Sequence, residues 1–436
     1  MDYVYTPSNT SASSRLSSQA VIMQIINSIS TIVNLFISSF LVSFIMSINA
    51  NEPLSETLIS VGLYNISLYV VFTLVYFGIS YIVDKTRRIW IFRISLIVKG
   101  LFIILIIFLG EKIAKFAILA GAVQGIADAL YWASYNVIKG EIVSRAHFEK
   151  YATFGSILGK VVSIIFPVLI GYLIDISTFL NIAIYVFLIV IIQVVLTIFI
   201  KSMKPKGAHF DFFDYRRKLK SNSPEIKRVK RFYPLALVYG FKTVIGSIVP
   251  ILTIYTFKTN LNLGIFTALT SIFSIFVLIL FNKFTKYGHR KIIFAILGAI
   301  MLISSVIVAI WLEKWSYVVY NFAQSFVYII LANTIDADRN VIIKKTGFYD
   351  EIAEHNFLTE TLLNISRIIG YALMVVFGLF FDVLGLKILT IIMGVGVPVL
   401  AYFQNKLEEY EKDYPINLVG QRESDNKPAE NNLESQ

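Results

Sequence analysis

The stretch 80-SYIVDKTRRIW-90 joins two long apolar segments through a short charged turn. The first segment begins at about residue 57, and the second continues to about residue 109. A membrane-spanning helix needs roughly 20 mostly apolar residues, so this pattern predicts two spans joined by a loop. The charges between the spans either only set the membrane topology or take part in a conformational change. The rest of the sequence helps to distinguish the two.

The 436-residue chain is more apolar than a water-soluble protein, with 56% hydrophobic and 15% charged residues. Soluble domains carry about 25% charged residues and fewer than half apolar ones. The apolar runs are long and continuous, whereas the strands of a membrane barrel are segments of about 10 residues with alternating polarity. We therefore predict an all-α integral membrane protein. Its twelve expected transmembrane helices lie at approximately 20–47, 57–83, 89–109, 116–143, 151–174, 180–200, 232–257, 263–281, 292–312, 316–335, 356–381 and 385–403.

The basic residues are distributed unevenly between the two sides of these spans. Thirty of the 39 Lys and Arg residues fall on the side of the N-terminus, and only five fall in the opposite loops. Cytoplasmic loops carry such an excess, so both termini are expected in the cytoplasm of a multi-pass protein in the cytoplasmic (inner) membrane. A composition rich in Ile, Lys and Asn indicates a bacterial source. The net charge of +11 then reflects topology, and the scattered bases indicate no nucleic-acid partner.

The longest internal polar segment follows the sixth predicted span and divides the chain. The first 19 residues lack a basic region followed by an apolar core, so no removable signal peptide is expected. Part of the central segment, 209-HFDFFDYRRKLK-220, mixes aromatic and basic residues. It is either a helix on the inner leaflet in contact with membrane lipids or a solvated linker. The predicted parts are a cytoplasmic tail 1–19, a six-helix bundle 20–200, a basic cytoplasmic linker 201–231, a second six-helix bundle 232–405 and a polar cytoplasmic tail 406–436.

The two halves share a weak internal repeat. Gln124 and Gln324 are 200 residues apart, and 171-GYLID-175 matches 378-GLFFD-382 at an offset of 207. Lys160 meets Arg367 at that same offset. The common order of these matches predicts two pseudo-symmetric six-helix bundles.

A six-plus-six membrane protein with a charged loop between spans 2 and 3 resembles the major facilitator superfamily. In that family the loop carries a small residue, then Asp, a base, Gly and further bases. Here Ser80 is followed by Asp84, Lys85, Arg87 and Arg88, and the Gly is missing. The corresponding loop of the second half, 285-TKYGHRKI-292, keeps the Gly but has Thr in place of Asp.

This resemblance implies the fold of the family, in which two helical bundles rock around a central site. It also implies that Asp84, Lys85, Arg87 and Arg88 form a cytoplasmic latch, whose ion pairs are weak enough to be reversible. The alternative is that the three bases only set the topology. Span 151–174 is similar to the Gly- and Pro-rich helix of many antiporters in the family, which favours export.

We single out six of the charged side chains inside predicted spans, because a charge at the middle of the membrane costs at least about 2.5–3.5 kcal/mol on insertion scales. They are Lys99, Asp128, Lys160, Lys242, Glu360 and Arg367. Asp128 lies in 124-QGIADALYWASYN-136, where Gln124, Asp128 and Tyr131 share one helical face and Trp132 lies beside it. In the family, spans 1, 4, 7 and 10 line the cavity, so Asp128 is a candidate for proton coupling or cation contact. The alternative is a structural pair with Lys160 or Lys99.

The second half offers a matching set of polar residues. Span 10 carries Gln324 and Tyr328 four residues apart, which would form an opposite wall suited to a ligand with apolar bulk and a few polar handles. Lys160 and Arg367 form a paired cationic clamp if both face the cavity. Glu360 and Asn364 share the face of Arg367. The alternative is that Glu360 and Asp128 neutralise the two cations.

We therefore expect a secondary active transporter that works by alternating access. We expect a monomeric antiporter that exports a small amphipathic molecule in exchange for protons, with Asp128 or Glu360 carrying the proton. Sodium is the alternative coupling ion. The alternatives are an uptake symporter or exchanger for a small organic anion, and a lipid or glycolipid flippase. We expect no enzyme activity, cofactor or metal site, because the four His residues lack zinc-ligand spacing and no phosphate-binding loop or nucleophile elbow is present.

Overall fold

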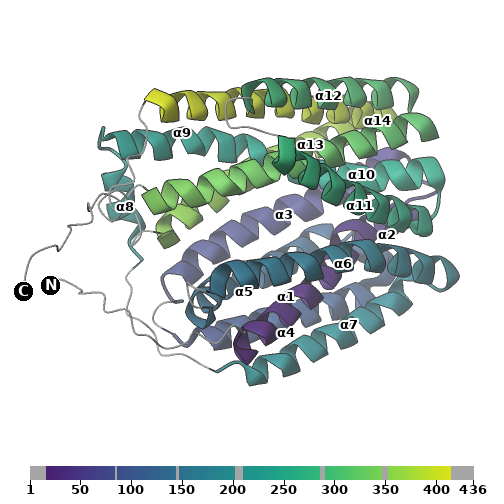
Figure 1. The fold of residues 1–436 in the computed structure, drawn as a ribbon. Coiled ribbons are helices and arrows are strands. Elements are labelled where there is room, and N and C mark those ends of the chain that lie inside the picture. Colours follow the sequence, from purple (N-terminus) through teal and green to yellow (C-terminus); the bar gives the residue numbers. More distant parts are fainter. Residues whose placement is uncertain are drawn as a thin grey trace, which may run out of the picture. The chain divides into compact units, whose positions relative to one another are not determined.

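The computed structural model describes residues 16–83, 86–143, 147–201, 210–284, 290–345 and 352–413. Throughout these ranges the regular structure is helical (Figure 1). A π-helical turn, Phe36–Phe40, joins the first two helices into one span. The helices are α1 (Ser18–Leu35), α2 (Leu41–Ile48), α3 (Leu54–Ser80), α4 (Arg88–Leu109), α5 (Ala117–Ile142), α6 (Phe148–Ile176), α7 (Phe179–Leu196), α8 (Phe212–Lys218), α9 (Pro224–Tyr239), α10 (Lys242–Phe257), α11 (Asn260–Phe284), α12 (Arg290–Trp311), α13 (Lys314–Lys345) and α14 (Ile352–Asp413).

Within the described residues, ten helical segments are long and apolar enough to cross a membrane. One of them, Ala353–Tyr410, is 58 residues long and holds two spans, separated by the non-helical backbone of Asp382 (φ 43°, ψ −122°). Helix α5 is missing from the ten because the polar face predicted from its sequence lowers its mean hydropathy. Counting α5 and both parts of α14 gives the twelve predicted spans, and the all-α integral membrane fold is confirmed.

The helix ends follow local sequence signals. Ser17, Thr178 and Ser223 cap α1, α7 and α9, because each side chain accepts a hydrogen bond from the backbone N–H three residues later. Pro224 occupies the first turn of α9, where a missing N–H costs nothing. Helix α9 therefore begins inside the segment predicted as the basic linker.

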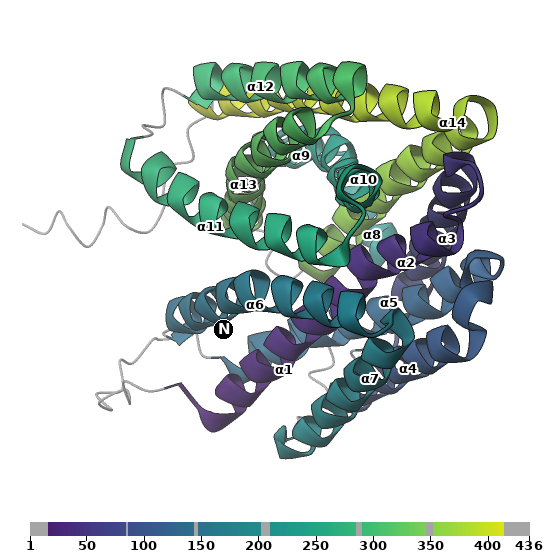
Figure 2. The same cartoon turned by 90° about the vertical axis from the view of Figure 1, so that its right-hand side faces the viewer.

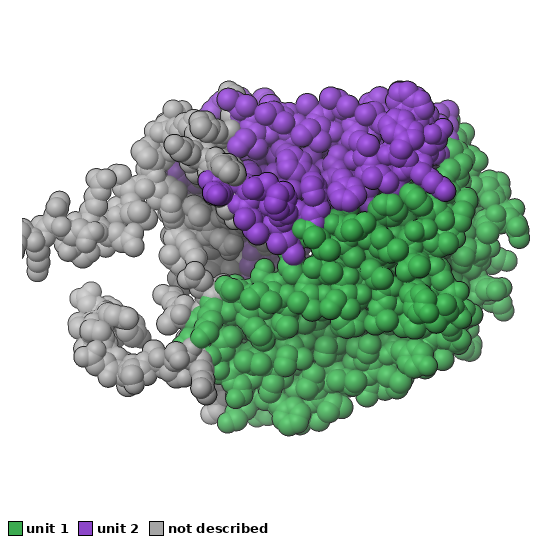
Figure 3. Space-filling view, turned by 45° about the vertical axis from the view of Figure 1, so that its right-hand side comes forward, with its two compact units in different colours: residues 1–209, 246–272, 374–383 green, residues 210–245, 273–373, 384–436 purple. Residues whose placement is uncertain are grey.

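Contacts divide the chain into two compact units, which Figure 3 colours green and purple. Unit 1 comprises Met1–His209, Gly246–Ile272 and Met374–Val383, and unit 2 comprises Phe210–Ile245, Phe273–Leu373 and Leu384–Gln436. The units group residues by contact and differ from a simple cut at the central linker. The six-plus-six division of the sequence stays a prediction.

In unit 1, α5 packs most extensively on α3, and α4 packs on both α5 and α7 (Figure 2). Gly121 and Gly125 make the approach of α5 to α3 possible. A Cβ atom at either position would clash with the backbone carbonyl of Tyr64 or Leu68. Small residues four apart allow such close packing of membrane helices. This contact sets the rotation of α5, and with it the direction in which its polar face points.

Two matching carboxylates cap helices within unit 1. Asp175, at the end of α6, accepts hydrogen bonds from the backbone N–H groups of Asn260 (3.0 Å) and Leu261 (2.8 Å) at the start of α11. Asp382, in α14, accepts one from the N–H of Ser55 (2.8 Å) in the first turn of α3. A carboxylate is favoured at a helix N-terminus because the unpaired N–H groups there carry partial positive charge. The two positions are those matched at an offset of 207, which supports the repeat.

In unit 2, the junction of α9 and α10 is wound more tightly than an α-helix. The N–H groups of Phe241, Thr243 and Val244 each donate to a carbonyl three residues earlier, and the bond from Thr243 to Gly240 is 3.1 Å long. Gly240 lies against α14, where a Cβ atom would clash with the Leu363 carbonyl and the Ser366 hydroxyl. A 3₁₀ stretch inside a long helix often marks a functional position. This one holds the middle of the Pro224–Phe257 span against α14.

Helix α8 lies in the predicted linker and belongs to unit 2. Tyr215 is buried, and its hydroxyl lies 2.9 Å from the Tyr233 hydroxyl and 3.1 Å from His355 Nδ1. The ring of Phe212 packs edge-on against that of Phe357. The opposite face exposes Phe213 and basic side chains. Part of the linker is thus a docked amphipathic helix, and its contact with lipid stays a prediction.

Candidate functional site

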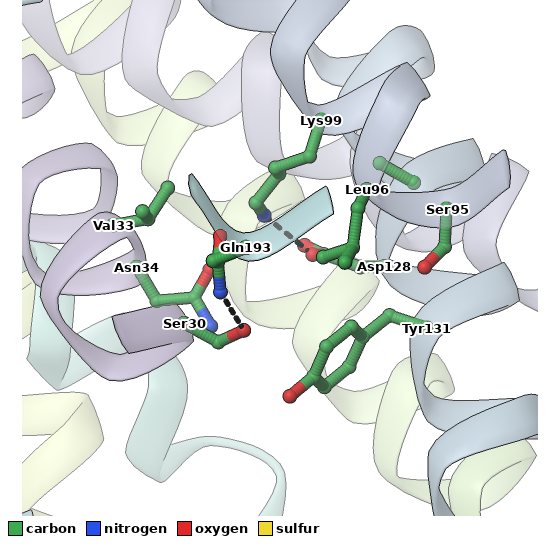
Figure 4. A pocket seen from close by; sticks show the side chains of 10 residues that line it. Ser30, Val33, Asn34, Ser95, Leu96, Lys99, Asp128, Tyr131 and Gln193 are labelled. Carbon is green, nitrogen blue, oxygen red and sulfur yellow. Dashed lines mark hydrogen bonds and ion pairs between the residues drawn. The ribbon is translucent and has the colours of Figure 1, made fainter. Parts of the chain in front are cut away.

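The polar face of α5 points into unit 1, as its spacing predicts. Lys99 of α4 donates a hydrogen bond to Asp128 Oδ1 at 2.6 Å and forms an ion pair with it. The side chain of Lys99 is 9% exposed and that of Asp128 is 20% exposed. Figure 4 shows the two side chains directed toward each other. Of the two partners that the sequence left open for Asp128, the structure pairs it with Lys99.

Gln124 completes the surroundings of this carboxylate from one turn earlier in α5. Its Nε2 donates to Asp128 Oδ2 at 3.2 Å. Its Oε1 is buried and accepts no hydrogen bond from any residue that the structure describes. One amide group therefore offers Asp128 both a donor, now in use, and an acceptor.

A small pocket of about 10 Å³ lies beside the ion pair. A cavity needs roughly 10–15 Å³ to hold one water molecule, so this pocket suits a proton, a water or a small ion better than a whole substrate. Figure 4 shows its labelled side chains. The lining residues are Ser30, Val33, Asn34, Ser95, Leu96, Lys99, Ala127, Asp128, Tyr131 and Gln193.

Hydrogen bonds between helices hold the walls of this pocket. The Tyr131 hydroxyl donates to Asn27 Oδ1 of α1 at 3.2 Å. Gln193 of α7 donates from Nε2 to Ser30 Oγ (2.7 Å) and to the Ile26 carbonyl (3.0 Å). Trp132 is 40% exposed and lies outside the pocket lining, and its ring packs edge-on against that of Tyr131 at 5.4 Å between centroids. Gln124, Asp128 and Tyr131 are thus brought together, and Trp132 lies at the edge of the group.

In unit 2, Arg367 of α14 lies in a polar network. Its Nη1 donates to Asn364 Oδ1 at 2.6 Å and lies 3.8 Å from Glu360 Oε2. Its Nε donates to Thr243 Oγ1 of α10 at 3.2 Å. The predicted face of Glu360, Asn364 and Arg367 is therefore assembled, and Arg367 has a carboxylate partner on its own helix.

The repeat-equivalent cation, Lys160 of α6, has different surroundings. It is partly buried and has no hydrogen bond or ion pair with any of the residues described. Lys160 belongs to unit 1 and Arg367 to unit 2. Their pairing as a clamp stays a prediction.

The polar residues of span 10 bond mostly to one another along α13. Gln324 Nε2 donates to Asn321 Oδ1 at 3.0 Å, and Asn321 Nδ2 donates to the Tyr317 hydroxyl at 2.9 Å. Tyr328 is buried and faces Lys242 of α10, with 5.9 Å from the Lys242 Nζ to the ring centroid. A role for Gln324 and Tyr328 in substrate binding stays a prediction.

Lys242 was predicted from the sequence to be an interior charge, but it was not assigned to the site. It lies near the middle of the 34-residue span Pro224–Phe257. Its Nζ donates to the Tyr239 hydroxyl at 3.2 Å and lies 5.3 Å from the centroid of the same ring. The signal in the sequence was its position inside an apolar run, which by itself marks a functional candidate.

The predicted latch is only partly within the structure. Asp84 and Lys85 lie outside the described residues. Arg87 is exposed, whereas Arg88 is buried and forms an ion pair with Glu141 of α5. Arg88 therefore links the start of α4 to the end of α5 within unit 1, and the latch stays a prediction.

Comparisons with known proteins agree with this architecture. A Bacillus subtilis (strain 168) protein, named only as the uncharacterized protein YqgE, is 22% identical over 371 residues, which is 82% of this chain and 84% of that protein. A second relative, from Geobacillus stearothermophilus, is 22% identical over 115 residues and covers 26% of this chain and 54% of its own length. Neither name states a function.

Solved transporter structures share the fold at low sequence identity. The nucleoside transporter NupG (D323A mutant) has a TM-score of 0.66 at 12% identity, covering 89% of this chain and 100% of NupG. A bacterial homologue of the iron transporter ferroportin has a TM-score of 0.65 at 12% identity, over 89% of this chain and 98% of the other. The human organic anion transporter MFSD10 has a TM-score of 0.62 at 9% identity, over 89% and 99%.

The family model described as Major Facilitator Superfamily matches residues 24–338, which is most of the chain. The match begins in α1 and ends in α13, so it includes the Lys99–Asp128 pair and Lys242. The chain is therefore a multi-pass membrane protein that belongs to the major facilitator superfamily, a family of secondary transporters.

Proposed function

We propose that this transporter exports a small amphipathic molecule in exchange for protons, and that Asp128 carries the coupling proton. The observation that supports this is the Lys99–Asp128 ion pair at 2.6 Å, which lies inside the spans and beside a pocket too small for a whole substrate. A carboxylate in that position has no structural need that an apolar pair could not meet, since buried ion pairs are often no better for stability than packed hydrophobic residues.

The residues around Asp128 suit both of its protonation states. While it is ionised, Lys99 and the Gln124 amide nitrogen donate to its two oxygens. Once protonated, the carboxyl becomes a donor, and rotation of the Gln124 amide would present Oε1 as the acceptor. The neutral polar groups of the same pocket are the Tyr131 hydroxyl and the side chains of Ser30, Asn34, Ser95 and Gln193.

Protonation would act on conformation through Lys99. Neutralising Asp128 removes the partner of a buried cation, so the arrangement in which the two side chains meet loses stability relative to any arrangement that hydrates Lys99. A ligand that shifts a conformational equilibrium must bind its two states unequally, and the proton would do so here. Coupling to substrate follows if the substrate favours the arrangement that the proton disfavours.

The test uses the full-length protein in liposomes with an imposed pH gradient. Three probes would be used separately: ethidium as an amphipathic cation, 2-naphthoate as an amphipathic anion, and a fluorescent glycolipid. We expect at least one probe to move in the direction opposite to the protons, and Asp128→Asn to reduce that movement at least tenfold. Glu111→Gln, which alters an exposed carboxylate outside the pocket, is the matched control and should leave it unchanged.

Other outcomes would change the conclusion. Movement of a probe in the same direction as the protons would support an uptake symporter in place of export. Glycolipid transfer without any pH dependence would support a flippase. Proton coupling through interior carboxylates is wrong if Asp128→Asn and Glu360→Gln both transport the probe as the wild type does.

A further inference from the structure

The interior charges of the spans do not balance. Of the six interior charged side chains singled out above, four are cations and two are carboxylates. Asp128 pairs with Lys99, and Glu360 pairs with Arg367. Among the residues that the structure describes, no carboxylate forms an ion pair with Lys160 or Lys242. An uncompensated charge inside a membrane is costly, so it calls for a partner that arrives from outside the chain.

Lys242 is the better placed of these two cations, because its surroundings hold it without neutralising it. Its contacts among the described residues are with tyrosines: the hydroxyl of Tyr239 and the rings of Tyr239 and Tyr328. An ammonium group has three N–H donors, of which one goes to Tyr239. Cation–π contact stabilises the positive charge but leaves it uncancelled. The side chain is therefore fixed in place and keeps its capacity to bind an anion.

A second cation, Arg367, is bound to the same segment as Lys242. Thr243, the next residue, accepts a hydrogen bond from Arg367 at 3.2 Å, so two cations are attached to one tightly wound turn. Arg367 has a carboxylate partner, Glu360, at 3.8 Å. Lys242 has no counter-ion among the residues that the structure describes. A monoanion would supply one.

We propose that Lys242, with Tyr239 and Tyr328, forms an anion subsite, and that the transported molecule is an organic monoanion with a carboxylate on an aromatic or apolar body. The ammonium of Lys242 would pair with the carboxylate, and the tyrosine rings would contact the body. This inference rests on the proposed function in one respect, that the substrate is small and amphipathic. It does not depend on proton coupling through Asp128.

The chain contains no cysteine, so Lys242→Cys creates a single reactive thiol in the full-length protein. The purified variant would be treated with 2-aminoethyl methanethiosulfonate, which restores an ammonium on a side chain of similar length, or with methyl methanethiosulfonate, which adds a neutral group. Ligand binding would be measured by thermal shift with three matched pairs: benzoate and benzamide, 2-naphthoate and 2-naphthamide, and indole-3-acetate and indole-3-acetamide. Each amide keeps the shape of its carboxylate without the charge.

We expect at least one carboxylate to raise the Tm of the wild type while its amide does not. Lys242→Cys should weaken that binding at least tenfold, and the aminoethyl reagent but not the methyl reagent should restore it. Lys258→Cys is the matched control, because Lys258 directly follows the same span and its Nζ lies 4.8 Å from the ring centroid of Tyr255, also three residues earlier. The control should bind like the wild type.

The subsite is overturned if no carboxylate stabilises the wild type more than its amide. It is also overturned if untreated Lys242→Cys binds the carboxylate as tightly as the wild type. Because the aminoethyl-treated protein has the same chain as the untreated one, recovered binding excludes misfolding as the cause of the loss. Carboxylate binding together with unaltered pH-driven transport by Asp128→Asn would keep the subsite and refute only the coupling proposal.

Discussion

Two lysines near the middle of membrane spans have opposite surroundings in this protein. Lys99 in unit 1 is buried against Asp128, so its charge is cancelled within the chain. Lys242 in unit 2 lies between Tyr239 and Tyr328, so its charge is stabilised but not cancelled. Both were equally conspicuous as charges in apolar runs. The difference indicates that the partner, more than the presence of the charge, distinguishes the two lysines, and it is the reason for the different roles that we propose for them.

The largest loss of stability is expected when the Lys99–Asp128 ion pair is broken. Asp128→Asn leaves a buried ammonium without its counter-ion, which should lower the free energy of unfolding by roughly 3–5 kcal/mol. Lys99→Gln combined with Asp128→Asn should recover most of that loss, because it removes the stranded charge. Chemical unfolding of the detergent-solubilised proteins would measure both. A double variant no more stable than the single one would contradict the view that the pair is a unit.

An intermediate effect is expected at Arg367, whose surroundings lie between the two extremes. Arg367→Gln removes a hydrogen bond to Asn364 and a 3.8 Å contact with Glu360, whose side chain is 26% exposed. Since both charges are partly hydrated, the loss should be about 1–2 kcal/mol. The same unfolding measurement checks this, with Glu360→Gln as the reciprocal variant. A loss as large as that of Asp128→Asn would mean that this pair too is fully desolvated.

The smallest change in stability is expected at Lys242, which would distinguish it further from Lys99. Lys242→Met removes one hydrogen bond and two cation–π contacts, and it also removes a charge that has no counter-ion among the described residues. These terms oppose each other, so the free energy of unfolding should change by less than about 1 kcal/mol. A loss of several kcal/mol would instead identify Lys242 as a structural residue.

Several features of the fold and the site could be predicted from patterns in the sequence. The spans followed from long apolar runs, and the shared face of Gln124, Asp128 and Tyr131 followed from helical spacing. The matched carboxylates Asp175 and Asp382 followed from the repeat, although their role as caps did not. Trp132 was grouped with the site by its position in the sequence, yet it lies outside the pocket lining.

The sequence by itself determined that this chain enters a membrane as helices and that its interior charges need partners. Both follow from the cost of placing polar groups in hydrocarbon, which depends on residue type and run length. Only the tertiary structure decided that Asp128 meets Lys99 and that Lys242 meets Tyr328. Those choices depend on the rotation and spacing of the helices, which close contacts such as that of Gly125 with the Leu68 carbonyl set. Such contacts join residues far apart in the chain, and no local pattern encodes them.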